Sequence, residues 1–139
     1  MDRFKSTKVA SVFGIIGNLF LLVIKGIVAI LSGSQAMIAD AFNSFGDIFS
    51  SLMTYFGNKI SSKKADDDHN LGHGKAEYIY SMLISISMIL MAILVLKNSI
   101  VSLFYRSEYS FSIWLIVVCI TTIIVKLSLY LYTNKLYKK

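Results

Sequence analysis

Residues 18–47 read NLFLLVIKGIVAILSGSQAMIADAFNSFGD, and this stretch decides the fold. Its first half is apolar except for Lys25, the polar segment SGSQ follows, and a weaker apolar run then carries Asp40 and Asp47. A helix needs roughly 20 apolar residues to cross about 30 Å of hydrocarbon. The pattern predicts two membrane helices joined by a tight turn, and the second helix must hide a polar face.

The rest of the chain continues this pattern. Of the 139 residues, 55% are hydrophobic and none is proline, and the mean hydropathy is +0.65. The apolar residues gather in long runs, which excludes a water-soluble globule, a disordered chain and a collagen-like fibre. The runs also lack the alternation, over about ten residues, of barrel strands. We therefore predict an all-α membrane protein with four transmembrane helices, at about 9–31, 36–60, 77–98 and 111–133.

The distribution of basic residues predicts the orientation. They gather in the N-terminal segment 1–8, around the loop 61–76 and after the fourth span, which a four-span chain places on one side. The opposite side carries only Lys97 and Arg106. Because loops rich in Lys and Arg stay in the cytoplasm, we expect a multi-pass cell-membrane protein with both termini cytoplasmic. The net charge of +6 then reflects membrane orientation rather than nucleic-acid binding.

Polar residues of the second span fall on one face. Helical residues are about 100° apart, so one stripe contains Asp40, Asn43, Ser44, Asp47, Ser51, Thr54 and Asn58. Asp47 lies half-way along the span, where an ionised carboxylate costs about 2.5–3.5 kcal/mol. It must therefore face a water-filled path, a cation or a basic partner. Asn43 lies one turn earlier, so both side chains can offer oxygen to one cation, and other helices must complete the ligand shell.

A polar seam between helices is the alternative interpretation of this stripe. In that case Asp47 pairs with a lysine and the serines are small packing residues. Asp40 lies nearer the end of the span and suits a solvated mouth or a helix cap. We interpret Lys25 and Lys126, which lie within spans, as side chains that snorkel to an interface. Salt bridges from these lysines to Asp40 or Asp47 are the alternative.

Two motifs resemble the cation diffusion facilitator, or cation efflux, family, whose members export divalent metals. Residues 34–47, SQAMIADAFNSFGD, are similar to the family pattern S-x-A-x-x-A-D-A-x-H/N/D-S-x-x-D. Residues 66–79, DDDHNLGHGKAEYI, are similar to its loop D-x-x-H-x-x-G-H-G-K-x-E. The resemblance implies that Asn43 and Asp47 are the second-span ligands of a central transport site. It also implies a second, cytoplasmic-side metal site at Asp66, His69 and His73.

The loop at residues 66–79 has an alternative interpretation without a metal, and Lys75 and Asp40 are expected to have structural roles. Without the resemblance, the loop reads as a solvated segment whose aspartates offset nearby lysines. The resemblance places Lys75 in a charge cluster at a dimer interface. Asp40 is expected to have a structural or charge-balancing role rather than to ligate the transported metal.

The chain departs from the family in its extent. Family members have six spans and a cytoplasmic ferredoxin-like domain, whereas residues 126–139, KLSLYLYTNKLYKK, resemble the place just before span five. The resemblance therefore implies a four-span, incomplete part of the bundle, with two central ligands elsewhere. We expect a fragment or a split or truncated product, which works as a homodimer or with a completing chain that supplies spans five and six.

The expected function is export of a divalent metal, coupled to proton entry as in the family. Amide and carboxylate oxygens form a hard shell, which favours manganese over iron(II) or zinc. No prosthetic group and no enzymatic activity are expected. Two histidines and one cysteine exclude a membrane di-iron enzyme and a cysteine zinc cluster. A non-transporting truncated membrane protein or dimerisation partner is the alternative. Export requires that the counter-charge of Asp47 be a cation rather than a fixed basic neighbour, and a carboxylate locked permanently to an ammonium group would leave only common ancestry with the exporters.

Overall fold

Four long helices make up the protein in a computed structural model, which describes residues 3–63, 72–104 and 113–137. They are α1 (Arg3–Ser32), α2 (Gln35–Ser61), α3 (Ala76–Phe104) and α4 (Ile113–Tyr137). The described residues contain no strand, which confirms the predicted all-α class. The helices continue past the apolar runs at several ends, because the polar residues that follow these runs are also good helix formers.

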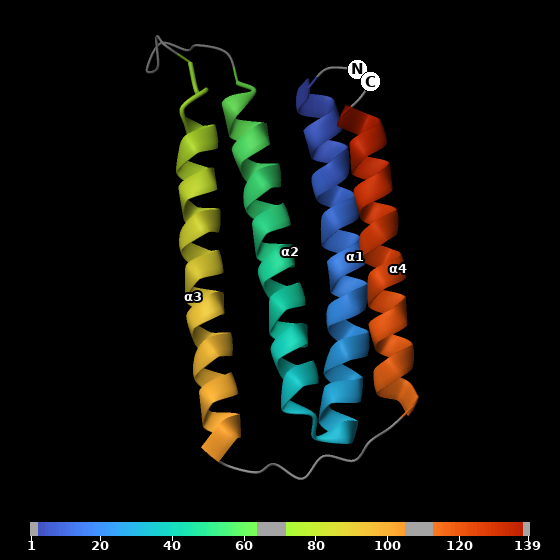
Figure 1. The fold of residues 1–139 in the computed structure, drawn as a ribbon. Helices are drawn as coiled ribbons and strands as arrows, with labels where there is room; N and C mark the ends of the chain where they lie inside the picture. Colours follow the sequence, from blue (N-terminus) through green and yellow to red (C-terminus); the bar gives the residue numbers. More distant parts are fainter. Residues whose placement is uncertain (1–2, 64–71, 105–112, 138–139) are drawn as a thin grey trace.

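The helices lie side by side in the order α3, α2, α1, α4 (Figure 1). Helix α1 packs against α2 and α4, and α2 also packs against α3. The start of α1, the end of α2, the start of α3 and the end of α4 lie at one end of the bundle, together with both termini (Figure 1). We call this the terminal end. It carries most of the basic residues, whereas Lys97 lies towards the other end of α3.

The turn between α1 and α2 explains why these two helices form a tight pair. Gly33 adopts φ 66°, a left-handed conformation that glycine reaches without steric cost and that commonly ends helices. Ser34 then caps α2, because its side chain accepts a hydrogen bond from the Met37 amide at 3.3 Å. The segment SGSQ therefore ends one helix and begins the next within a few residues.

Glycines bring the helices close together. A Cβ added to Gly14 would lie 2.7 Å from Ser51 Oγ on α2, and one added to Gly17 would lie 2.8 Å from a methyl carbon of Leu129 on α4. Small residues allow such approaches between membrane helices, where packing rather than water exclusion drives association. The absence of a side chain at Gly17 leaves room for Leu129 of α4 against α1.

Much of the apolar surface faces outward. Among the described residues, α3 has no buried side chain and α4 has only Val118. Helices α1, α3 and α4 are each long and apolar enough to cross a membrane, so the chain is a multi-pass membrane protein whose outward face suits lipid. Helix α2 is more polar, and it packs between α1 and α3.

Candidate metal centre

The most deeply buried charge of the described chain is Lys25, which lies between α1 and α2, about two turns before the end of α1. Its side chain is only 1% exposed. The ammonium forms a salt bridge with Asp40 Oδ2 at 2.9 Å and donates a hydrogen bond to Ser44 Oγ at 3.0 Å. Ser44 donates in turn to the Asp40 carbonyl oxygen at 3.3 Å. We call these three residues the Lys25 cluster.

The Lys25 cluster corrects two expectations from the sequence. The snorkelling interpretation of Lys25 is wrong, because its ammonium bonds to Ser44 and Asp40 of α2 instead of extending to the membrane–water interface. Asp40 is not the cap of α2, since Ser34 has that role. Asp40 instead neutralises the buried lysine while its own side chain remains 41% exposed. A charge-balancing role for Asp40 fits these contacts.

A second ion pair lies at the middle of the bundle. Asp47 Oδ2 accepts a charge-assisted hydrogen bond from the Lys126 ammonium. Asp47 lies near the centre of α2 and Lys126 near the centre of α4, so both are far from the helix ends. Snorkelling is therefore wrong for Lys126 as well. The alternative drawn from the sequence, in which Asp47 pairs with a lysine, is the arrangement that the structure shows.

The two ion pairs differ in burial and in number of partners. Lys25 has a side-chain exposure of 1% and two side-chain partners. Lys126 and Asp47 have exposures of 37% and 35%, and within the described residues the Lys126 ammonium has the single partner Asp47. A partly open pair with one contact is held less firmly than a buried cluster. The Asp47–Lys126 pair is therefore the more accessible of the two ion pairs, and the Lys25 cluster is the more enclosed.

Asn43 lies on α2 one turn from Asp47, and its side chain is exposed. This spacing places the two side chains one above the other on the helix. Oxygen donors from one turn of one helix leave most of a divalent ion's coordination shell open. Further ligands must come from water or from protein outside the described residues.

Two of the three candidate residues of the loop site, Asp66 and His69, lie outside the described residues. His73 is described, and its carbonyl oxygen accepts the Ala76 amide at 3.0 Å in the turn that begins α3. Lys75 is exposed in the same turn. Within the described residues no group of three or more His, Cys, Asp and Glu could hold a metal, so the loop site stays a prediction.

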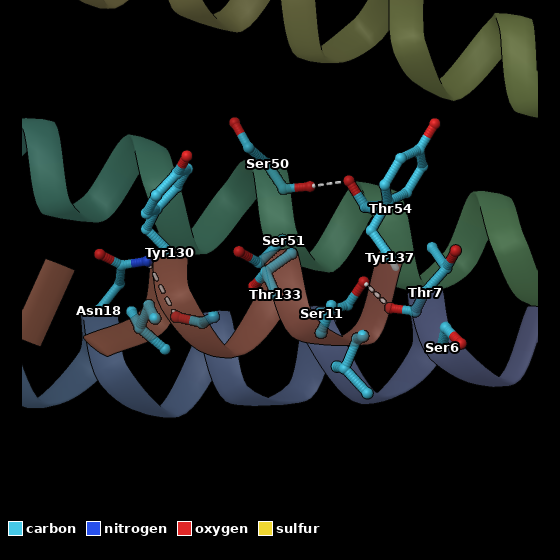
Figure 2. Close-up of a pocket in the computed structure, with 14 residues that line it drawn as sticks. Ser6, Thr7, Ser11, Asn18, Ser50, Ser51, Thr54, Tyr130, Thr133 and Tyr137 are labelled. Atoms are coloured by element: carbon cyan, nitrogen blue, oxygen red, sulfur yellow. Dashed lines mark hydrogen bonds between the residues drawn. The ribbon is translucent and has the colours of Figure 1, made fainter. Parts of the chain in front are cut away.

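An open cavity, lined by residues of α1, α2 and α4, lies between these three helices. Its volume is about 550 Å³. Figure 2 shows hydroxyl side chains from all three helices along it, with Asn18 at one end. Sequence reasoning placed Ser51 and Thr54 on the polar stripe of the second span, but it gave no role to Asn18 on the first.

Comparison with known proteins identifies the family of this chain. The model of the cation efflux transmembrane domain matches residues 11–139. This chain belongs to the cation efflux family. The membership confirms the resemblance drawn from residues 34–47 and 66–79.

Individual members of the cation efflux family resemble the chain along much of its length. The magnetosome protein MamM of Paramagnetospirillum magneticum is 46% identical over 76 residues, which are 55% of this chain and 24% of that protein. MamM of Magnetospirillum gryphiswaldense is 35% identical over 125 residues, 87% of this chain and 38% of that protein. The manganese efflux system protein MneS of Bacillus subtilis is 34% identical over 107 residues, 77% of this chain and 37% of that protein. The chain thus spans well under half the length of these relatives.

Proposed function

We propose that the protein takes part in export of a divalent metal cation, with Asp47 and Asn43 as metal ligands. One observation carries this proposal: the Asp47 carboxylate, at the middle of α2, has as its counter-charge an ammonium on another helix, and both side chains are partly exposed. An unpaired ionised carboxylate in the middle of a membrane span is costly, so a cation or a bound proton must neutralise Asp47. The Lys126 ammonium neutralises Asp47 when the metal is absent, and the metal displaces this ammonium when it binds.

The exchange at Asp47 gives the site two occupied states. In the first, the Lys126 ammonium bonds to Asp47. In the second, a divalent cation bonds to Asp47 and Asn43, and the ammonium moves away on its flexible stem. Because a metal ligand must be deprotonated to bind, protons compete with the metal for Asp47. We propose that this competition couples metal export to proton entry through a third state, in which Asp47 is protonated and bonds to neither the metal nor the ammonium.

Manganese is the metal that we propose. Carboxylate and amide oxygens are hard ligands, which suit manganese better than zinc. The relatives MneS and MneP of Bacillus subtilis are both described as manganese efflux system proteins, which supports this choice. Iron(II) and zinc remain the alternative cations for the same pair of ligands.

Replacing Asn43 with histidine should shift the metal preference towards zinc. Imidazole is a softer ligand than an amide oxygen and is common in zinc sites. We expect the ratio of zinc to manganese transport to rise by about tenfold, equivalent to about 1.4 kcal/mol. Uptake of each metal into inverted membrane vesicles measures the ratio, and Asn43→Gln, which keeps an amide oxygen, is the control. An unchanged metal profile in Asn43→His would contradict the role of Asn43 as a ligand.

The length of the relatives supports an assembly larger than this chain, and the basic residues support its orientation in the membrane. We propose that the terminal end faces the cytoplasm, because it carries most of the basic residues. The family relatives are more than twice as long as the matched segment. We propose that the remaining metal ligands come from a completing segment or chain, or that two copies combine as a homodimer. A chain that only stabilises such an assembly, without ligating the metal at Asp47, is the second candidate, because Asp47 already has a basic partner.

A further inference from the structure

An apolar groove lies between α1 and α2, in the half of this helix pair that is nearer to the connecting turn. Small residues form its floor, namely Gly26 and Ala29 of α1 and Ala41 of α2. A Cβ added to Gly26 would meet no atom within 4 Å, so the space above the floor is open. Larger and half-exposed side chains, among them Phe42 and Phe45 of α2, form the walls. The groove is separate from the cavity that α1 and α2 share with α4.

The lining of the groove has no polar side chain. It consists of eight residues, four from each helix, and none of them has a hydrogen-bonding side-chain group. A water molecule needs two to four polar partners, and it finds no side-chain partner here. The groove also faces away from the polar stripe of α2, since Phe45 lies about 160° around the helix from Asp47. Its occupant must therefore be hydrocarbon.

The groove runs along the helices, from near the α1–α2 turn towards the middle of the spans. On α1 its lining extends from Ile30 back to Leu22, which is about 12 Å at 1.5 Å per residue. On α2 it extends from Ile38 to Phe45. The hydrocarbon of one leaflet is about 15 Å deep, half of the membrane core. A groove of this length and direction matches an acyl chain that enters from the leaflet at the end of the bundle opposite the terminal end (Figure 1).

The size of the groove favours one hydrocarbon chain over a segment of protein. Its volume is about 290 Å³, slightly below the range of about 300–1,000 Å³ for pockets that hold drug-sized ligands. A helix with its side chains is about 10–12 Å in diameter, which is too wide for this space. The eight lining residues are also far fewer than the roughly 20–30 residues a side of a stable protein interface. A second copy of the chain can therefore lie over the groove, but it does not fill the groove.

We propose that this groove binds one acyl chain of a phospholipid from the leaflet at the α1–α2 turn. Lipid tails are as apolar as the lining, so dispersion contacts rather than exclusion of water hold the chain, and an unfilled groove would lose these contacts. Residues 30–38 carry no charge, so the groove recognises the chain and not the headgroup. Ala29 lies one turn after Lys25, and Ala41 follows Asp40. The bound chain therefore also packs against the helices that the Lys25 cluster joins.

Photo-crosslinking of the 139-residue chain in phosphatidylcholine nanodiscs tests this site. The probe is a phosphatidylcholine with a diazirine in the middle of one saturated acyl chain, and mass spectrometry maps the labelled residues. We expect more labelling of the groove than of α3, whose described side chains are all outside the core. Gly26→Leu fits without a clash of its Cβ and fills the floor, so the ratio of groove to α3 labelling should fall about fivefold. Phe42→Ala, which removes one wall, should also lower the ratio.

Ala92→Leu is the matched control, because Ala92 is an exposed small residue of α3 that does not line the groove. It should leave groove labelling unchanged. Equal groove labelling in the wild type, Gly26→Leu and Phe42→Ala, with all three helical by circular dichroism, would overturn the site, because the lipid would then be ordinary solvent. Dimers that protect the groove from the probe would assign it to a second copy. A phosphatidylglycerol probe with the same chain should label the groove equally, and a preference for either headgroup would also contradict the proposal.

Discussion

Replacing Asp47 with alanine should abolish metal export while the protein still reaches the membrane. The carboxylate is the one charged ligand that this chain offers at the centre of α2, and an alanine cannot bind either the metal or the Lys126 ammonium. We expect export to fall to the level of cells that lack the transporter. Retention of manganese by loaded cells that express the complete transporter measures export, and surface labelling measures the amount of protein in the membrane.

The double variant Asp47→Ala/Lys126→Met is the control for this result. Asp47→Ala alone leaves an ammonium without its partner in the membrane interior, which costs free energy. The double variant removes that charge, so its abundance should match the wild type while export stays absent. Export that returns in the double variant would assign the loss to the uncompensated lysine, and normal export by Asp47→Ala would refute the site.

Replacing Asp40 with alanine should cause the largest loss of stability among single substitutions at the described charged residues. Lys25 would keep Ser44 but lose its only counter-charge within the described chain. Leaving a buried charge unpaired costs about 3–5 kcal/mol. Thermal unfolding in detergent, followed by the helical circular dichroism signal, should show a much lower midpoint for Asp40→Ala than for the wild type.

A second variant separates charge from packing at this cluster. Lys25→Met/Asp40→Leu removes both charges and keeps similar volumes, so most of the stability should return, because a buried ion pair is often replaceable by apolar residues. Lys126→Met should cost less than Asp40→Ala, since the Asp47–Lys126 pair is partly open. Equal stability of the wild type and Asp40→Ala would contradict the burial of a charged Lys25.

Much of the fold could be predicted from the sequence because apolar runs of membrane length have few alternatives. The turn at Gly33 and the pairing of Lys25 with Asp40 belong to the same local hairpin. Both charges lie at nearly equal distances along the chain from Gly33, so an antiparallel pair brings them together. These similar separations from Gly33 could have predicted the salt bridge, but the sequence interpretation preferred snorkelling and did not use them.

The Asp47–Lys126 contact could not be predicted in the same way. It joins α2 and α4, two helices that are distant in sequence and that each pack against α1. Asn18 Oδ1, which is buried and has no hydrogen-bond partner among the described residues, was equally hidden, because it depends on which amide atom bonds to Gly14. Periodicity places a residue on a face, but it does not say which partner fills that face.

Mn²⁺ binding to the wild type and to Lys126→Met, measured by calorimetry in nanodiscs, most directly tests the exchange of an ammonium for a metal at Asp47. If Lys126 competes with the metal, its removal should tighten binding at Asp47 by about tenfold or more, because a nearby like charge is lost. The tighter binding should vanish in Lys126→Met/Asp47→Ala. An affinity that is unchanged or weaker in Lys126→Met would show that the lysine does not hold the place of the metal.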